Sequence, residues 1–289
     1  MTRRSTLRRR RDRVRVSLIA AACALACAAA RADEGTAPAD APAPDAAGDN
    51  APLPHAMTVD VGGALSTLSN GYGNWQSLTG RLTYEPAPGN TTYADVALAR
   101  EFSENGAIFS LGHVQEFASS WIVTGFLTLG GGGDFEPREK VDLSLGRKLL
   151  ADQQLVATIG VSADRFRDGH SDRALITGLA WYGVPQWVLE GGIRFNWSDP
   201  GDVAGRRYYG AATWGTEGRD FVAVRAETGN EAYQVIAPGQ ALVNFDSQLA
   251  SATWRHWLKP DRGFSIGTEV YHNPSYRRVT LMGTAFFQF

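Results

Sequence analysis

Apolar and polar residues alternate one by one along most of the chain from Met57 to Phe289. The clearest alternation runs through Gln76–Glu85, Val141–Lys148, Leu155–Asp164, Trp187–Trp197 and Phe264–Tyr271. Because successive side chains of a strand point to opposite faces, this period of two predicts amphipathic β-strands. Helical spacing is not sustained in this part of the sequence, so we expect an all-β domain.

Connections that contain Gly, Pro or polar residues separate the predicted strands. One set is short: Ala87–Gly89, Ser119–Ser120, Ala151–Asp152, Val184–Pro185, Glu217–Gly218 and Pro260–Asp261. The other set is mostly longer or more polar: Ser69–Asn74, Ser103–Asn105, Gly131–Pro137, Arg167–Ser171, Ser198–Gly205, Gly229–Gln240 and Asn273–Ser275. The two sets alternate, as in an antiparallel up-and-down barrel. Counting the segments between them predicts about 14 strands, with about 12 or 16 as alternatives.

The two faces of these strands favour a transmembrane barrel over a soluble one. The apolar face carries tryptophans near strand ends, namely Trp121, Trp187, Trp197, Trp214 and Trp254. Aromatic residues in such positions are typical of the interfacial girdles of outer-membrane barrels. Closure would also satisfy every backbone hydrogen bond in lipid. The alternative is a periplasmic β-sandwich, whose strands alternate in the same way.

The last predicted strand alternates regularly up to the final residue. Val279, Leu281, Phe287 and Phe289 share one face, and Phe286 interrupts the polar face opposite them. A terminal aromatic residue that closes such a strand resembles the C-terminal signal read by the assembly machinery of outer-membrane barrels. Phe287 and Phe289 are therefore the candidate assembly signal.

The first 55 residues differ in composition from the rest. Residues 1–32 combine an Arg-rich start, an apolar alanine-rich stretch and the small residues Ala30 and Ala32, which is the layout of a cleaved signal peptide. The apolar stretch is shorter than the roughly 20 residues of a spanning helix. Residues 33–55 hold mainly Pro, Ala, Asp and Gly and predict a disordered leader. The barrel domain would then occupy residues 56–289.

Cleavage after Ala32 would change both the cysteine content and the charge. Cys23 and Cys27 lie in the signal peptide, so no disulfide or thiolate site is expected, although the alternative is that Cys27 becomes a lipidated N-terminus. The mature chain would keep 19 of 28 basic and 29 of 30 acidic residues, a formal charge of −10. Such a charge repels nucleic acid, so no nucleic-acid partner is expected. As a transmembrane barrel, the chain would be surrounded by outer-membrane lipid and lipopolysaccharide.

Charged residues on the polar face are the candidates for lining the barrel lumen. They are Arg81, Asp95, Asp142, Lys148, Glu190, Arg194, Arg225, Glu227 and Glu269. In a filled barrel such charges pair across strands, because an isolated charge in a low dielectric is costly. In an open barrel they line a pore and select what passes, since lumen width grows with strand number. The sequence is compatible with both.

The residues offer little for catalysis. The histidines of the predicted barrel are not spaced as metal ligands, so neither a metal nor another cofactor is expected. An alternative function is a hydrolase or acyltransferase for lipid or lipopolysaccharide, with a serine beside His113 or His256 on the lipid face near one rim. The Gly130–Gly133 run lacks the Lys-Ser/Thr of a phosphate-binding loop. Another alternative is a structural or adhesive surface protein that uses the predicted loop Gly229–Gln240.

Several motifs follow one another along the predicted barrel. Ser69–Trp75 comes after the first strand, Thr177–Tyr182 lies in the middle, and Trp254–Leu258 and Tyr276–Val279 precede the terminal Phe289. In this order and spacing they resemble the YaiO-type outer-membrane β-barrels, over residues 57–289. Many of those relatives carry helical repeats before the barrel, where this chain has only the predicted leader.

The resemblance implies a location, a fold and a looser functional association. We expect a non-enzymatic outer-membrane barrel, with a narrow pore linked to export or secretion of cell-surface polysaccharide. The family contributes no catalytic residue that could be transferred to this chain. The polysaccharide association rests on analogy with the family.

Overall fold

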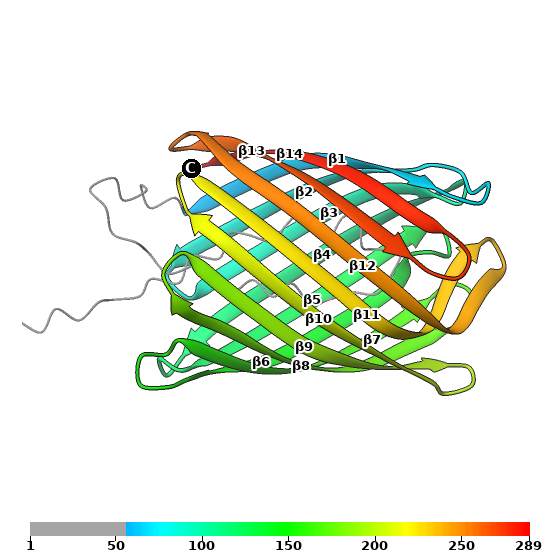
Figure 1. The fold of residues 1–289 in the computed structure, drawn as a ribbon, viewed down its shortest axis with the longest axis horizontal. Coiled ribbons are helices and arrows are strands. Elements are labelled where there is room, and N and C mark those ends of the chain that lie inside the picture. The colour runs from blue at the N-terminus through cyan, green and yellow to red at the C-terminus, as the bar shows by residue number, and fades with distance from the viewer. Residues whose placement is uncertain (1–55) are drawn as a thin grey trace, which may run out of the picture.

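The computed structural model describes residues 56–289, which form one closed barrel of fourteen antiparallel strands (Figure 1). The strands are β1 (Met57–Leu68), β2 (Trp75–Ala87), β3 (Asn90–Glu101), β4 (Glu104–Phe117), β5 (Trp121–Gly132), β6 (Pro137–Leu149), β7 (Leu155–Phe166), β8 (Ser171–Val184), β9 (Trp187–Asp199), β10 (Val203–Thr216), β11 (Asp220–Ala237), β12 (Gln240–Lys259), β13 (Arg262–His272) and β14 (Arg277–Gln288). The predicted signal peptide, the leader and Cys27 lie outside the described residues. Within residues 56–289, no helix is long and apolar enough to cross a membrane.

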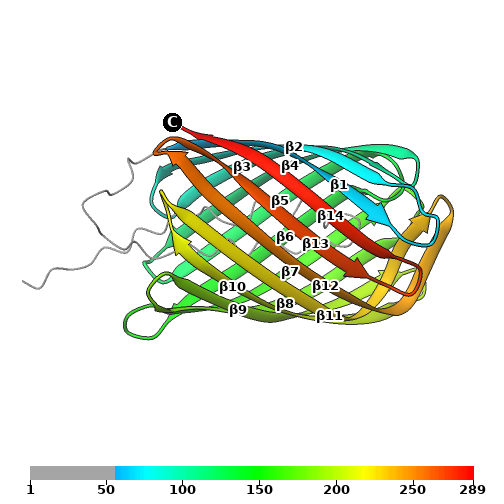
Figure 2. The same ribbon diagram turned by 45° about the horizontal axis from the view of Figure 1, so that its top comes forward.

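The barrel closes between its first and last strands. Each strand pairs with its neighbours in sequence, and β1 pairs with β14 from Thr58 opposite Gln288 to Leu68 opposite Arg278 (Figure 2). The Phe289 amide also donates to the Met57 carbonyl at 2.8 Å. The prediction of an up-and-down antiparallel barrel with about 14 strands is therefore confirmed.

Two of the predicted loops are wrong, because strand pairing continues through them. The connection in Ser198–Gly205 shrinks to residues 200–202, and the connection in Gly229–Gln240 shrinks to residues 238–239. Gly229 and Asn230 are typical loop residues, yet β11 continues past them and Val235 still lies opposite Ala241 of β12.

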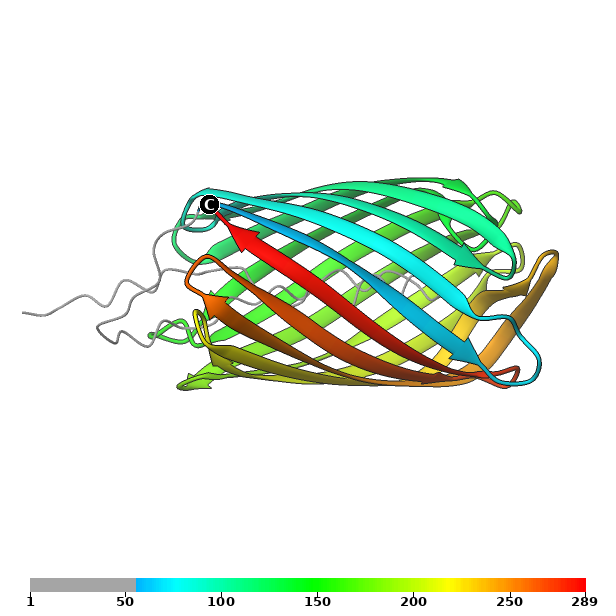
Figure 3. The same cartoon turned by 90° about the horizontal axis from the view of Figure 1, so that it is seen from above.

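The β11–β12 hairpin extends beyond both neighbouring strands. Pairing of β11 with β10 ends at Asn230, and pairing of β12 with β13 ends at Gln248. Residues 231–245 thus pair only with each other, at the end of the barrel opposite the C-terminus (yellow to orange in Figure 3). We call residues 231–245 the hairpin extension.

The outer face of the barrel is apolar and the inner face is mostly polar. On β14, Leu281 is 65% exposed, whereas Arg278, Thr280 and Phe286 are buried, and Phe289 directly after the strand is 62% exposed. This is the reverse of a water-soluble barrel and matches a barrel in lipid.

Glycines make room for aromatic rings on the inner wall. A Cβ at Gly112 of β4 would lie 2.1 Å from the ring of Phe126, and one at Gly192 of β9 would lie 2.5 Å from the ring of Tyr209. Both rings therefore lie close against the backbone of a neighbouring strand. This arrangement leaves the inner space to the longer charged side chains.

Candidate functional site

The nine charged residues predicted to line the lumen all lie on the inner face, in alternation with outward-facing apolar residues. The structure brings Arg81 together with Asp95, and Arg225 together with Glu227. Asp142, Lys148 and Glu269 instead pair with residues that the sequence did not single out.

Ion pairs cross the strands of the inner wall. Arg81 Nε lies 2.5 Å from Asp95 Oδ1 on the adjacent strand, and Arg81 Nη2 donates to Asp95 Oδ2 at 3.2 Å. Lys140 Nζ lies 3.7 Å from Asp142 Oδ1 and 3.7 Å from Asp164 Oδ2. Pairing of this kind offsets the cost of placing charges inside the barrel.

One ion pair ties the two ends of the sheet together. Arg255 Nη1 of β12 donates to Asp60 Oδ1 of β1 at 2.7 Å, across β13 and β14. The Arg255 guanidinium also lies 3.6 Å from the centroid of the Phe286 ring. This contact gives the apolar Phe286 on the polar face of β14 a partner, and it lies at the junction that closes the barrel.

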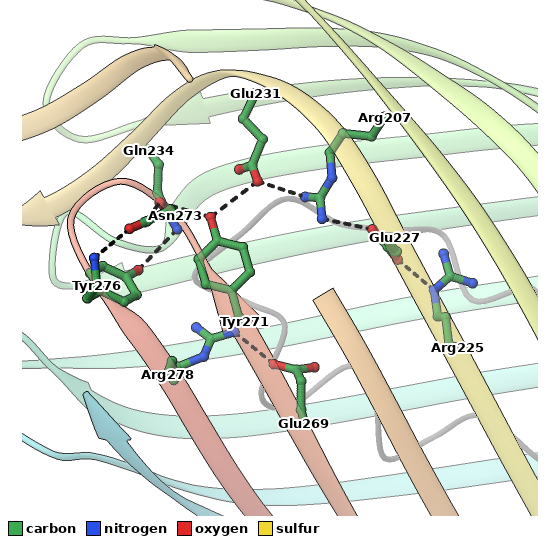
Figure 4. Close-up of polar contacts among 10 residues, drawn as sticks. All are labelled: Arg207, Arg225, Glu227, Glu231, Gln234, Glu269, Tyr271, Asn273, Tyr276 and Arg278. Atoms are coloured by element: carbon green, nitrogen blue, oxygen red, sulfur yellow. Dashed lines mark hydrogen bonds and ion pairs between the residues drawn. The ribbon is translucent and has the colours of Figure 1, made fainter. Parts of the chain in front are cut away.

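A chain of ion pairs runs along the inner wall toward the hairpin extension (Figure 4). Arg225 Nε donates to Glu227 Oε1 at 2.6 Å, and the other oxygen of Glu227 lies 2.9 Å from Arg207 Nη2. Arg207 Nη1 lies 3.5 Å from Glu231 Oε1, and Glu231 is the first residue of the extension. The wall and the extension are thus linked by charge.

The next residues of the extension bind the β13–β14 side of the mouth. Gln234 Oε1 accepts from Asn273 Nδ2 at 2.6 Å, and Gln234 Nε2 donates to the Tyr276 hydroxyl at 3.2 Å. The Tyr271 hydroxyl lies 3.2 Å from Glu231 Oε1 and 3.1 Å from Gln234 Oε1. Figure 4 shows these four polar side chains converging with Glu231.

The extension also contacts other loops of the mouth. Ile236 belongs to a buried cluster with Trp75 and Tyr276. In the opposite direction, the Tyr233 hydroxyl donates to Asp168 Oδ2 at 2.9 Å, and the Tyr233 ring lies 4.1 Å from the His170 ring. Trp75 begins β2 and Asp168 follows β7, on nearly opposite sides of the fourteen-strand barrel. The extension therefore crosses the opening of the barrel at the end opposite the C-terminus (Figure 3), which we call the outer mouth.

Asp168 is held ionised in the β7–β8 loop. Burial acts to raise the pKa of its carboxyl group, but hydrogen bonds from the amide and ring of His170 and from the Tyr233 hydroxyl lower it below its usual value. The carboxylate is therefore available to the Tyr233 hydroxyl at neutral pH.

A buried ion pair on β13 and β14 lies next to the aromatic residues of the outer mouth. Arg278 Nη2 donates to Glu269 Oε1 at 2.8 Å, and the guanidinium lies 5.0 Å from the Trp75 ring and 5.1 Å from the Tyr271 ring. Sequence reasoning missed Arg278, as it missed Arg207 and Glu231. Their partners depend on register between strands, which local pattern does not reveal.

The structure pairs the two histidines of the alternative enzyme with residues other than serine. His113 Nδ1 lies 3.0 Å from Thr92 Oγ1, and His256 Nδ1 lies 2.8 Å from Asp220 Oδ1. Within residues 56–289 neither histidine hydrogen-bonds to a serine, which the acyl-transfer chemistry would need. In the same range, His, Cys, Asp and Glu side chains do not form a group of three or more that could hold a metal ion.

One comparison with known proteins identifies the kind of barrel. The family model described as the YaiO membrane beta barrel domain matches residues 56–234. A search of curated proteins returns no match.

Solved structures with a similar fold are outer-membrane proteins. One is a bacterial polysaccharide outer membrane secretin, with a TM-score of 0.54 and 9% identity over 82% of this chain and 99% of the other. Another is an outer membrane channel from Pseudomonas putida F1, with a TM-score of 0.49 and 12% identity over 84% of this chain and 100% of the other. The translocator domain of autotransporter NalP from Neisseria meningitidis has a TM-score of 0.46 and 11% identity, over 85% of this chain and 90% of that domain. At such identities the likeness concerns the fold alone.

Proposed function

We propose that this chain, which belongs to the YaiO family of membrane β-barrels and therefore lies in the outer membrane, is a non-enzymatic, narrow channel. The channel would be associated with export or secretion of polysaccharide. The family resemblance of the sequence supports the association with polysaccharide. The solved structure of similar fold is a bacterial polysaccharide outer membrane secretin, and that likeness extends to this chain only as part of the proposal.

The observation that supports the channel is the polar inner wall, which carries charged side chains of both signs. These charges pair across strands, an arrangement that suits the wall of a pore as well as a filled barrel, so conduction has to be measured. Polar walls stabilise water and polar solutes inside the barrel and exclude lipid.

Delivery and assembly form part of the same proposal. Residues 1–32 direct export and are removed, and Phe287 and Phe289 present the C-terminal strand to the assembly machinery. Both side chains lie on the outer face, where they are exposed. Lipid and lipopolysaccharide surround the finished barrel.

Planar lipid bilayers test the proposed function. Purified, heat-modifiable protein should produce discrete current steps, and liposomes that contain it should swell in small neutral sugars. Because residues 231–245 cover the outer mouth, the same test includes a variant in which a two-residue Asn-Gly turn joins Asn230 to Asp246, which lie opposite each other in the hairpin. Correctly folded protein that is silent in both forms would refute the channel.

A further inference from the structure

We propose that the channel selects for cations, and that Asp142, Asp164 and Asp172 on the inner wall of β6–β8 set this selectivity. The inference rests on the proposed channel function. It adds the charge of the solutes that pass, which neither the fold nor the family membership determines.

Buried carboxylates outnumber buried basic groups in the barrel. Within residues 56–289, ten Asp and Glu side chains are buried, against six Lys and Arg side chains. Inward charges that are only partly buried, such as Arg225 and Glu190, occur with both signs and do not reverse this excess. Protonation of one or two buried carboxyl groups would still leave more negative than positive charge. The interior of the barrel is therefore negatively charged.

Most of the inner wall is nevertheless balanced in charge. Where β1 and β14 close the barrel, Arg255 pairs with Asp60, and Arg278 pairs with Glu269. The wall of β9–β11 carries three basic and three acidic side chains, namely Arg194, Arg207, Arg225, Glu190, Glu227 and Glu231. The excess of carboxylates must lie on other strands.

Part of the excess lies on β6, β7 and β8. Lys140 Nζ lies 3.7 Å from Asp142 Oδ1 and 3.7 Å from Asp164 Oδ2, so one ammonium group faces two carboxylates. Asp172 adds a third carboxylate, because it lies directly opposite Asp164 in the pairing of β7 with β8. All four side chains are buried. We call Asp142, Asp164 and Asp172 the carboxylate cluster.

Hydroxyl groups hold two of these carboxylates in place. Ser162 Oγ donates to Asp164 Oδ1 at 3.0 Å, and Ser198 Oγ donates to Asp172 Oδ1. The cluster is thus a fixed feature of the inner wall.

The carboxylate cluster is unfavourable for stability alone. Like charges directly opposite each other on neighbouring strands repel, as Asp164 and Asp172 must. Within residues 56–289, Asp142 Oδ1 and Lys140 Nζ are also buried without a hydrogen bond, because their separation of 3.7 Å is too long for one. Neutral residues would avoid both costs in a barrel that is only filled. The cluster therefore indicates a need for negative charge in the lumen.

The cluster lies where it can act on ions that enter at the outer mouth. Asp172 is the second residue of β8, and Asp164 lies two residues before the end of β7. Negative charges in a wall of low dielectric attract cations to the opening and repel anions. Asp and Glu side chains select cations in other channels in the same way. By the same argument, the channel would exclude acidic polysaccharides.

Reversal potentials in planar bilayers test the selectivity. They are measured with unequal KCl concentrations on the two sides, for the full-length mature protein and for the variant with the shortened hairpin. Because K⁺ and Cl⁻ have nearly equal mobilities in water, a preference between them reflects the channel. We expect K⁺ to be at least about threefold more permeant than Cl⁻ in both proteins.

Asp172→Asn is the main variant. Its amide oxygen can still accept the hydrogen bond from Ser198, and the repulsion with Asp164 is removed, so the barrel should fold as stably as wild type. The permeability ratio of K⁺ to Cl⁻ should fall at least about twofold. Asp172→Glu keeps the charge and should keep the wild-type ratio. Glu139→Gln removes a carboxylate from the outer face, next to Lys140 in the chain, and is the matched control with an unchanged ratio.

A double variant tests the cluster as a whole. Asp142→Asn with Asp172→Asn leaves Lys140 facing Asp164 alone, so the excess charge of the cluster is gone and the ratio should fall further than with Asp172→Asn. Gel mobility with and without heating checks that every variant folds.

The results separate the selectivity from the channel. If wild-type protein conducts but prefers Cl⁻ or neither ion, the selectivity is wrong and the channel stands. If it prefers K⁺ but the folded double variant keeps the wild-type ratio, the assignment to the carboxylate cluster is wrong. If wild-type protein and the variant with the shortened hairpin are both silent, the channel and its selectivity are both refuted.

Discussion

Removal of the Asp60 carboxylate should destabilise the barrel where its first and last strands meet. The side chains of Arg255 and Asp60 are only 9% and 8% exposed, and their polar atoms lie 2.7 Å apart. Asp60→Asn leaves the Arg255 charge without its carboxylate, and breaking a buried pair in this way costs about 3 kcal/mol or more. Arg255→Met added to Asp60→Asn removes both charges and should restore most of the lost stability, because a neutral pair has no desolvation cost to offset.

Unfolding in urea, in lipid vesicles, measures this effect through tryptophan fluorescence and the heat-dependent shift on gels. The control is Glu139→Gln, whose partner Arg165 has a side chain 75% exposed, so the loss should stay below about 1 kcal/mol. The reasoning would be refuted if Asp60→Asn cost no more than the control, or if the double variant were as unstable as Asp60→Asn alone.

Three other predictions concern assembly, packing and pH. Phe289→Ala should lower the amount of barrel in the outer membrane of cells, while the refolded protein loses less than about 1 kcal/mol, because the side chain is outside the packed interior; equal losses in both assays would contradict a signal role. Gly112→Val should cost about 1–3 kcal/mol in the same urea assay, since its side chain would collide with Phe126; unchanged stability would show that the ring is free to move. The pKa of Asp168 is lowered in the folded protein, so the hydrogen bond from Tyr233 contributes fully at pH values above the ordinary pKa of 3.8. That contribution is lost as the pH falls through the lowered pKa. Acid on the outer side should then open wild-type channels, and Asp168→Asn should lack this transition.

The strands were predictable from sequence because their signals are local. Alternation along β14, with Leu281 and Phe287 on one face and Thr280 on the other, indicates directly which side chains face lipid. The turn residues between strands are local signals too, and counting them was enough to predict the number of strands. The same kind of signal gave a wrong prediction at Gly229 and Asn230. These residues are typical of loops, but here they lie inside β11, which continues to pair with β12 on both sides of them.

The contacts of the inner wall could not be predicted, because they depend on register. Arg207 meets Glu227 and Glu231 only because β10 and β11 align Arg207 with Gly229. A shift of one residue would turn these side chains to the opposite face. The bond between Arg255 and Asp60 joins residues that are far apart in the chain, so only closure of the barrel brings them together.

Cysteine labelling of the inner wall tests the channel most directly. In a background without Cys23 and Cys27, Arg225→Cys places a thiol in the lumen, and Val224→Cys places one on the outer face next to it. A charged, membrane-impermeant thiol reagent should reduce the current through open Arg225→Cys channels and leave that of Val224→Cys unchanged. Equal effects on both variants, or no effect on Arg225→Cys, would contradict a conducting lumen lined by these charges.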